Sequence, residues 1–177
     1  MNLDLERIII DEIEISRRVK ELGRDITKEY QEKETLLICI LRGAVFFFAD
    51  LCRAIDIPIL MGFVSLSSYK DGTTSSGKVE ERQKLMADVK GKHVILVEDI
   101  VDTGLTLEGY GANLLSRGAL SVKICALLKK PEQKHDIDIA FKGFDIENRF
   151  VVGYGLDYAE HYRNLPYIGI LKKEIYS

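Results

Sequence analysis

Residues 94–106 read VILVEDIVDTGLT, in which four apolar residues lead directly into the adjacent carboxylates Glu98 and Asp99. Asp102 follows, and TGLT at 103–106 opens a predicted helix. An apolar run without polar alternation predicts a strand covered on both faces, as in a parallel sheet. Ligands of such sheets bind at the carboxyl ends of strands, where a following helix offers unpaired N–H groups and the positive end of its dipole. The stretch therefore predicts an α/β fold with a phosphate-binding turn beside two carboxylates.

These carboxylates and this turn allow two interpretations. Glu98 and Asp99 suit the hydroxyls of a ribose, directly or through a hydrated magnesium ion, because Mg²⁺ prefers oxygen ligands. The ordinary alternative is an acidic turn in which Asp102 or Thr103 merely caps the helix. Other phosphate motifs are missing, since the sequence has no G-x-x-x-x-G-K-S/T loop and GYG at 109–111 lacks the third glycine of a dinucleotide fingerprint.

Outward from this stretch, helical and strand-like patterns alternate along the chain. Apolar spacing predicts helices over residues 13–30, 44–55 and 105–117. Apolar runs predict strands over residues 36–41, 59–66, 93–97 and 122–128. This alternation indicates a parallel sheet with right-handed crossovers. The polar stretch 67–82 predicts a lid or a disordered loop, and we expect small strands outside the main sheet at 137–141, 150–152 and 167–171.

The composition indicates one globular domain with a small attached subdomain. The chain has 177 residues, of which 46% are hydrophobic, and its net charge of −3 creates no field that would attract a polyanion. Cys39, Cys52 and Cys125 lie in apolar stretches without paired spacing, which disfavours a zinc site or disulfides and favours a reducing cytoplasm. The N-terminal residues lack the basic start of a signal peptide, and no apolar run is long enough to span a membrane. We therefore expect neither a membrane nor nucleic acid as a partner.

As a whole, residues 94–106 resemble the phosphoribosyl-pyrophosphate-binding signature of the type I phosphoribosyltransferases. Four further motifs narrow the resemblance to hypoxanthine-guanine phosphoribosyltransferases: LRG at 41–43, SY at 68–69, Lys130 after a Leu-Leu pair, and FVVGYGLDY at 150–158 with Arg163 beyond it. The resemblance implies the type I phosphoribosyltransferase fold, with a central parallel sheet flanked by helices. It places a core at about 14–130 and a small hood in the N-terminal segment and about 131–177.

The resemblance also implies a role for each motif on the phosphoribosyl side. The 5′-phosphate loop is formed by Asp102, Thr103, Gly104, Leu105 and Thr106, and the ribose is bound by Glu98 and Asp99. The pyrophosphate is contacted by Leu41, Arg42, Gly43 and Arg163, and the peptide before Arg42 is cis in the family. The expected cofactor is Mg²⁺, held by Glu98, Asp99 and Asp157. Arg42 and Leu105 each stand where some relatives carry lysine, and neither change removes a backbone donor.

On the purine side, the resemblance implies that Lys130 donates to the exocyclic oxygen of the base, Phe150 stacks on its face and the Val151 backbone reads its edge. Asp157 belongs to the same purine site as well as to the magnesium ligands. A 6-oxo group accepts and a 6-amino group donates, so a cationic donor favours hypoxanthine or guanine over adenine. Lys129 is an alternative donor to the same oxygen, because it is the adjacent residue. Asp102 is the expected general base at purine N7, and Ser68 and Tyr69 begin a mobile loop that excludes water.

Two alternatives stay open. The first is a nucleotide-sensing regulator on the same fold, although the chain has no dense basic run for nucleic acid. The second is a transferase for xanthine, adenine or a pyrimidine; Lys130 conflicts with adenine but not with xanthine. Members of the family form dimers and tetramers, so we expect a homodimer or homotetramer, and the sequence does not choose between them.

Overall fold

The computed structural model describes residues 2–71, 74–131 and 137–176, and only the backbone of residues 2, 68–71 and 74–79. A six-stranded sheet in the order β4-β3-β2-β5-β6-β7 forms its centre. Its strands are β2 (Thr35–Ile40), β3 (Leu60–Asp71), β4 (Thr74–Gln83), β5 (His93–Val101), β6 (Ser121–Lys129) and β7 (Phe141–Asp145). All neighbouring pairs are parallel except β3 and β4. The predicted parallel α/β sheet is confirmed.

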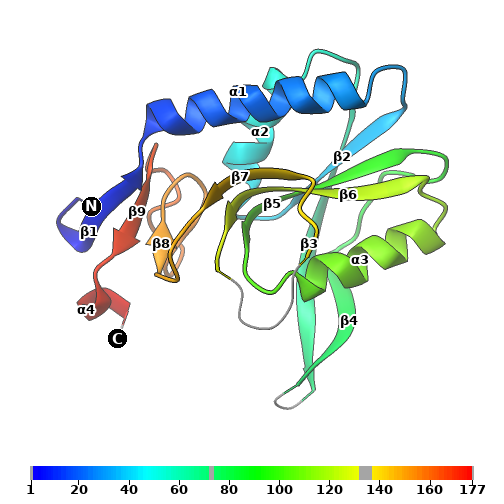
Figure 1. Cartoon of the computed structure of the whole chain (residues 1–177). Coiled ribbons are helices and arrows are strands. Elements are labelled where there is room, and N and C mark those ends of the chain that lie inside the picture. The colour runs from blue at the N-terminus through cyan, green and yellow to red at the C-terminus, as the bar shows by residue number, and fades with distance from the viewer. Residues whose placement is uncertain (1, 72–73, 132–136, 177) are drawn as a thin grey trace.

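Helices cover both faces of this sheet (Figure 1). α1 (Glu12–Glu29) and α2 (Val45–Ala54) lie on one face, and α3 (Leu105–Ser116) lies on the other. Alternate residues of β2 show why: Leu37 and Cys39 join the core under α1 and α2, whereas Leu36 and Ile38 join the core under α3. A strand covered on both faces needs a continuous apolar run, which is the pattern that the sequence carries.

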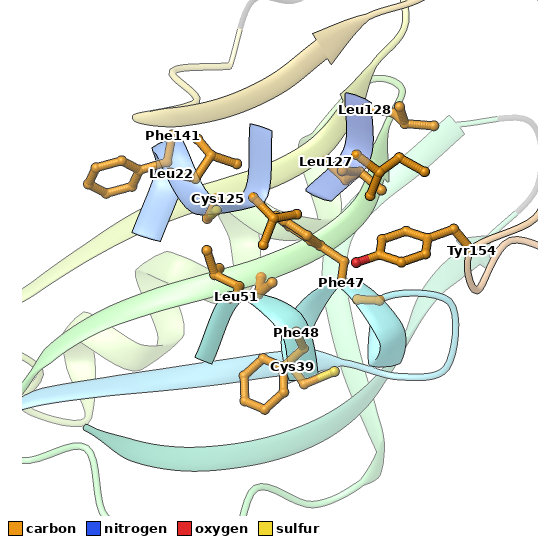
Figure 2. Close-up of a cluster of buried hydrophobic side chains, with 14 of the residues drawn as sticks. Leu22, Cys39, Phe47, Phe48, Leu51, Cys125, Leu127, Leu128, Phe141 and Tyr154 are labelled. Carbon is orange, nitrogen blue, oxygen red and sulfur yellow. The ribbon is translucent and has the colours of Figure 1, made fainter. Parts of the chain in front are cut away.

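The core under α1 and α2 is dense (Figure 2). Phe47 and Leu51 of α2 are fully buried beside Leu22 of α1 and Leu127 of β6. Each such side chain contributes about 1.5–3 kcal/mol when it is fully buried. This core fixes α2 directly after the β2 strand, and it therefore fixes residues 41–44 between the two elements.

A second, three-stranded sheet lies at one end of the molecule, where both chain ends come together (Figure 1). It contains β1 (Leu5–Ile10), β9 (Ile168–Leu171) and β8 (Val151–Val152), all antiparallel. The short helices η1 (Asn2–Asp4) and α4 (Lys173–Tyr176) flank it. This sheet positions residues 150–166 over the carboxyl edge of the main sheet.

Three expectations about individual segments were wrong. The described residues of the polar stretch 67–82 are strand rather than loop: β3 and β4 pair in antiparallel fashion, with Ser67 opposite Glu80. Backbone hydrogen bonds make such a pair, so it needs no apolar side chains. The expected strand at 137–141 begins only at Phe141, because Ile137 is buried against the β5–α3 turn instead. The strand β7 also pairs with β6, so it belongs to the main sheet.

Within the described ranges, no helix is both long and apolar enough to cross a membrane.

Candidate active site

The predicted phosphoribosyl residues gather at the carboxyl ends of neighbouring parallel strands. Residues 41–43 follow β2, residues 98–106 end β5 and enter α3, and Lys130 follows β6. The backbone N–H of Lys130 donates to the Val101 carbonyl oxygen over 3.0 Å, which holds the lysine beside Asp102. β5 is longer than expected and continues to Val101, so Glu98 and Asp99 are strand residues rather than turn residues.

The turn from β5 into α3 is open to a ligand. Gly104 is the N-cap residue, with φ +74°, and none of the side chains that the structure describes caps it. The ordinary interpretation, in which Asp102 or Thr103 caps α3, is therefore wrong. Both side chains are exposed. The first N–H groups of a helix and the positive end of its dipole favour an anion, so this turn is a candidate site for a phosphate.

Ile137 packs against this turn, a contact that no sequence pattern indicates. A Cβ atom on Gly104 would lie 2.6 Å from Ile137 Cγ2, so the two residues are in direct contact. Ile137 is 4% exposed and joins the core under α3. Its side chain fills the space next to Gly104, where a larger residue would clash with it.

Gly43 brings the other two segments of the site together. A Cβ atom on Gly43 would lie 1.6 Å from Asp99 Oδ2, so the carboxylate rests directly against the glycine. From the other side, Gly155 (φ +105°) approaches so closely that its Cβ would lie 1.9 Å from the Gly43 carbonyl oxygen. The Leu41–Arg42 peptide bond is cis, as the family resemblance implies. The loops after β2 and β8 and the end of β5 thus meet at one glycine.

Glu98 and Asp99 form an acidic pair without a cation among the described residues. Asp99 Oδ1 accepts from the Ile100 N–H over 2.8 Å, and Glu98 Oε1 accepts from the Asp99 N–H over 3.1 Å. Burial, followed by repulsion from the Asp99 carboxylate, raises the pKa of Glu98 well above its ordinary value. Bringing a cation near would relieve this repulsion.

These carboxylate oxygens suit Mg²⁺ chemically, but no ready-made metal cage is visible in the described part of the chain. No group of three His, Cys, Asp or Glu side chains gathers there in a metal-binding arrangement. Asp157, the third predicted ligand, pairs with Arg163 Nη2 at 2.9 Å. Since Mg²⁺ commonly keeps several waters and binds through one or two carboxylates plus substrate phosphates, the residues fit an ion that arrives with a substrate.

Asp157 belongs to a charged cluster on the loop after β8. Arg163 also donates from Nη1 to the Gly155 carbonyl oxygen over 2.7 Å, which anchors its guanidinium at the Gly43 junction. Arg42 reaches the same cluster through Glu160. The structure therefore brings the predicted pyrophosphate residues Arg42 and Arg163 together, with Glu160 as an unpredicted third member.

Phe150 and Val151 of the predicted purine residues lie at the second sheet, whereas Lys130 follows β6 of the main sheet. Val151 is buried in β8 opposite Ile170, and the Phe150 carbonyl oxygen accepts from the Leu171 N–H over 3.0 Å. The Phe150 ring stacks on Tyr176, with centroids 4.9 Å apart, and meets the edge of Tyr158 at 5.7 Å. One face of Phe150 is thus already covered. No sequence pattern indicated that Tyr176 would stack on Phe150, because this contact depends on where α4 lies.

The predicted mobile-loop residues lie in β3, and their side chains are outside the described residues. The base of their hairpin is fixed to α3: Glu81 Oε1 accepts from the Tyr110 hydroxyl over 2.8 Å and from Arg117 Nη1 over 3.0 Å. This contact links the hairpin to the helix that carries the phosphate turn.

Comparison with known proteins agrees with this geometry. The model of the phosphoribosyl transferase domain matches residues 9–159. The chain belongs to the phosphoribosyl transferase family. Within this family it is 47% identical over 175 residues to a hypoxanthine-guanine phosphoribosyltransferase of Streptococcus pneumoniae, covering 98% of this chain and 97% of the relative. It is 48% identical over 178 residues to the enzyme of that name from Bacillus subtilis, covering 100% and 99%.

A solved structure of a phosphoribosyl transferase supports the same assignment. A hypoxanthine phosphoribosyltransferase from Staphylococcus aureus superposes with a TM-score of 0.95 at 44% identity, covering 100% of this chain and 97% of that one. The expected fold, and the resemblance to the hypoxanthine-guanine branch, are therefore confirmed.

Proposed function

We propose that the protein transfers a phosphoribosyl group from phosphoribosyl pyrophosphate to hypoxanthine or guanine, forming IMP or GMP and pyrophosphate. The observation that carries this proposal is the uncapped α3 N-terminus at Gly104, directly after the acidic pair Glu98 and Asp99. The proposed ribose site and the proposed phosphate site thus follow one another in the chain, at the end of β5 and the start of α3. The names of the similar enzymes support the same reaction.

The reaction forms a bond between ribose C1′ and purine N9 and breaks the bond from C1′ to the pyrophosphate oxygen. Positive charge grows on the sugar as the leaving group takes the electron pair. Asp102, exposed beside the phosphate turn and next to the Lys130 backbone, takes the proton from purine N7. A positioned general base of this kind contributes about 10²–10⁴-fold to the rate.

The leaving pyrophosphate is stabilised by Arg42 and Arg163, whose guanidinium groups share the Glu160 carboxylate as a partner. Glu98, Asp99 and Asp157 would hold Mg²⁺ together with the substrate's own oxygens. When bound, the ion neutralises negative charge on the pyrophosphate. Closure of the β3–β4 hairpin, whose first strand carries Ser68 and Tyr69, would exclude water from the sugar.

The purine is read from the second sheet and from the end of β6. Lys130 donates to the 6-oxo group, the Phe150 ring, held by its stacking on Tyr176, stacks on the base, and the Val151 backbone reads the base edge. Initial rates with hypoxanthine, guanine, xanthine and adenine test this assignment. The 6-oxopurines should react and adenine should not. Turnover of adenine at a rate comparable with that of hypoxanthine would contradict the role of Lys130.

We further propose that the chain forms a homodimer or homotetramer and works in the reducing cytoplasm. Exposed apolar side chains of α2 and β3 support self-association: Val45, Phe46, Leu60, Met61 and Phe63. Cys39, Cys52 and Cys125 form no disulfide, which suits a reducing compartment. Light scattering coupled to gel filtration should give a mass of two or four chains, and a monomer at micromolar concentration would contradict the proposed assembly.

A further inference from the structure

Glu160 lies between the two arginines that are assigned to the pyrophosphate. Its Oε1 atom pairs with Arg42 Nη2, and its Oε2 atom lies 3.3 Å from Arg163 Nη2. The two oxygens of one carboxylate thus contact guanidinium groups from two loops far apart in the sequence. This bridging arrangement is the one that two neighbouring oxygens of a phosphate group would adopt.

The backbone holds Glu160 in this place. Ala159 and Glu160 have φ values of +48° and +65°, a left-handed conformation that is uncommon for residues other than glycine. The Glu160 N–H donates to Asp157 Oδ2 over 2.9 Å, and a bridge between Tyr158 and His161 closes the turn. The tight turn therefore fixes the backbone position from which the Glu160 carboxylate reaches the arginines.

The contacts of Glu160 are also easy to replace. Its side chain is 59% exposed and that of Arg42 is 67% exposed, so solvent screens the ion pairs. Pyrophosphate carries several negative charges on many acceptor oxygens, so it outcompetes a single carboxylate for two guanidinium groups. A bound pyrophosphate can therefore replace Glu160 as the partner of both arginines.

We propose that Glu160 is a resident counter-anion, which occupies the pyrophosphate position between Arg42 and Arg163 in the free protein and is displaced when pyrophosphate binds. This proposal rests on the proposed function, which assigns the two arginines to the pyrophosphate. Its consequence is that Glu160 lowers the affinity for pyrophosphate and assists its departure, because the arginines regain a partner as the product leaves.

The experiment measures binding of pyrophosphate, with Mg²⁺, to the full-length protein by isothermal titration calorimetry. Breaking an exposed ion pair changes a binding constant by only a small factor. Glu160→Gln should therefore bind pyrophosphate about three- to tenfold more tightly than wild type. In an Arg42→Ala background, where the main partner of Glu160 is absent, the gain should shrink to about twofold or less. Glu160→Ala should act in the same direction as Glu160→Gln if the glutamine variant is poorly folded.

Glu29→Gln is the matched control, because Glu29 also forms a partly exposed pair between elements, with Lys123 near the start of β6 at the opposite edge of the sheet. It should leave pyrophosphate binding unchanged. Weaker or unchanged binding by Glu160→Gln would overturn the proposal, since Glu160 would then orient the arginines or play no part. The proposal would also be overturned if affinity for pyrophosphate rose equally with and without Arg42, or if it rose in Glu29→Gln. Either result would indicate a general effect of removing negative charge. Absence of pyrophosphate binding by the wild type would instead refute the proposed function.

Discussion

Replacing Gly43 by alanine tests whether the contact between the β2–α2 loop and Asp99 is part of the active site. The new Cβ atom would lie 1.6 Å from Asp99 Oδ2 and 2.6 Å from its Cγ, far inside van der Waals contact, so the carboxylate must move. The backbone of Gly43 is outside the left-handed region, so alanine does not strain the loop itself. The substitution therefore displaces one proposed ribose ligand without removing it.

The expected loss follows from the interaction that Asp99 would make with the ribose. A hydrogen bond to a charged group is worth about 1.5–3 kcal/mol, so kcat/KM for phosphoribosyl pyrophosphate should fall about 10- to 150-fold. The assay is the initial rate with saturating hypoxanthine and varied phosphoribosyl pyrophosphate, followed by absorbance.

Gly111→Ala is the matched control, since its Cβ meets only Val122 Cγ1 at 3.5 Å. It should keep full activity and gain about 0.5–1 kcal/mol of stability, as expected for alanine in a helix interior. If Gly43→Ala retains kcat/KM within about twofold of wild type while its melting temperature is unchanged, the role of Asp99 is refuted.

Three further substitutions or modifications test other parts of the site. Asp102→Asn should lower kcat by about 10²–10⁴-fold, and an unchanged kcat would remove Asp102 as the general base. Lys130→Ala should raise KM for hypoxanthine by at least about tenfold, because it removes a hydrogen bond from a charged donor. KM for phosphoribosyl pyrophosphate should change little. Equal effects on both KM values would contradict the role of Lys130 in binding the purine. Burial raises the pKa of the Cys52 thiol to about 11, so its alkylation by iodoacetamide should be slow at pH 8 and rise about tenfold per pH unit towards pH 11, because only the thiolate reacts. Mass spectrometry follows the modified peptide, Cys52→Ser is the control, and rapid labelling of Cys52 at pH 8 would contradict the raised pKa.

Short stretches of the sequence predicted those parts of the fold that depend on residues adjacent in the chain. The apolar runs of β2, β5 and β6 are continuous because both faces of each strand are covered, and that requirement is visible in one short window of sequence. The phosphate turn was predictable for the same reason, since its glycine, its carboxylates and the start of α3 are adjacent in the chain.

Contacts between distant segments could not be predicted in this way. Ile137 lies under Gly104 because of how the chain returns after β6, and an isolated isoleucine carries no sign of that contact. The β3–β4 hairpin was missed because backbone pairing, rather than an apolar face, makes it. Glu160 reads in the sequence as an ordinary exposed acid, and only the fold places Arg42 beside it.

The central claim is that these segments form one phosphoribosyl-transfer site. The most direct test is to incubate the wild-type protein with hypoxanthine, phosphoribosyl pyrophosphate and Mg²⁺, and to quantify both products by chromatography. We predict equimolar IMP and pyrophosphate, with no product when either substrate is omitted. Absence of nucleotide with hypoxanthine and also with guanine, from a folded protein, would contradict the account.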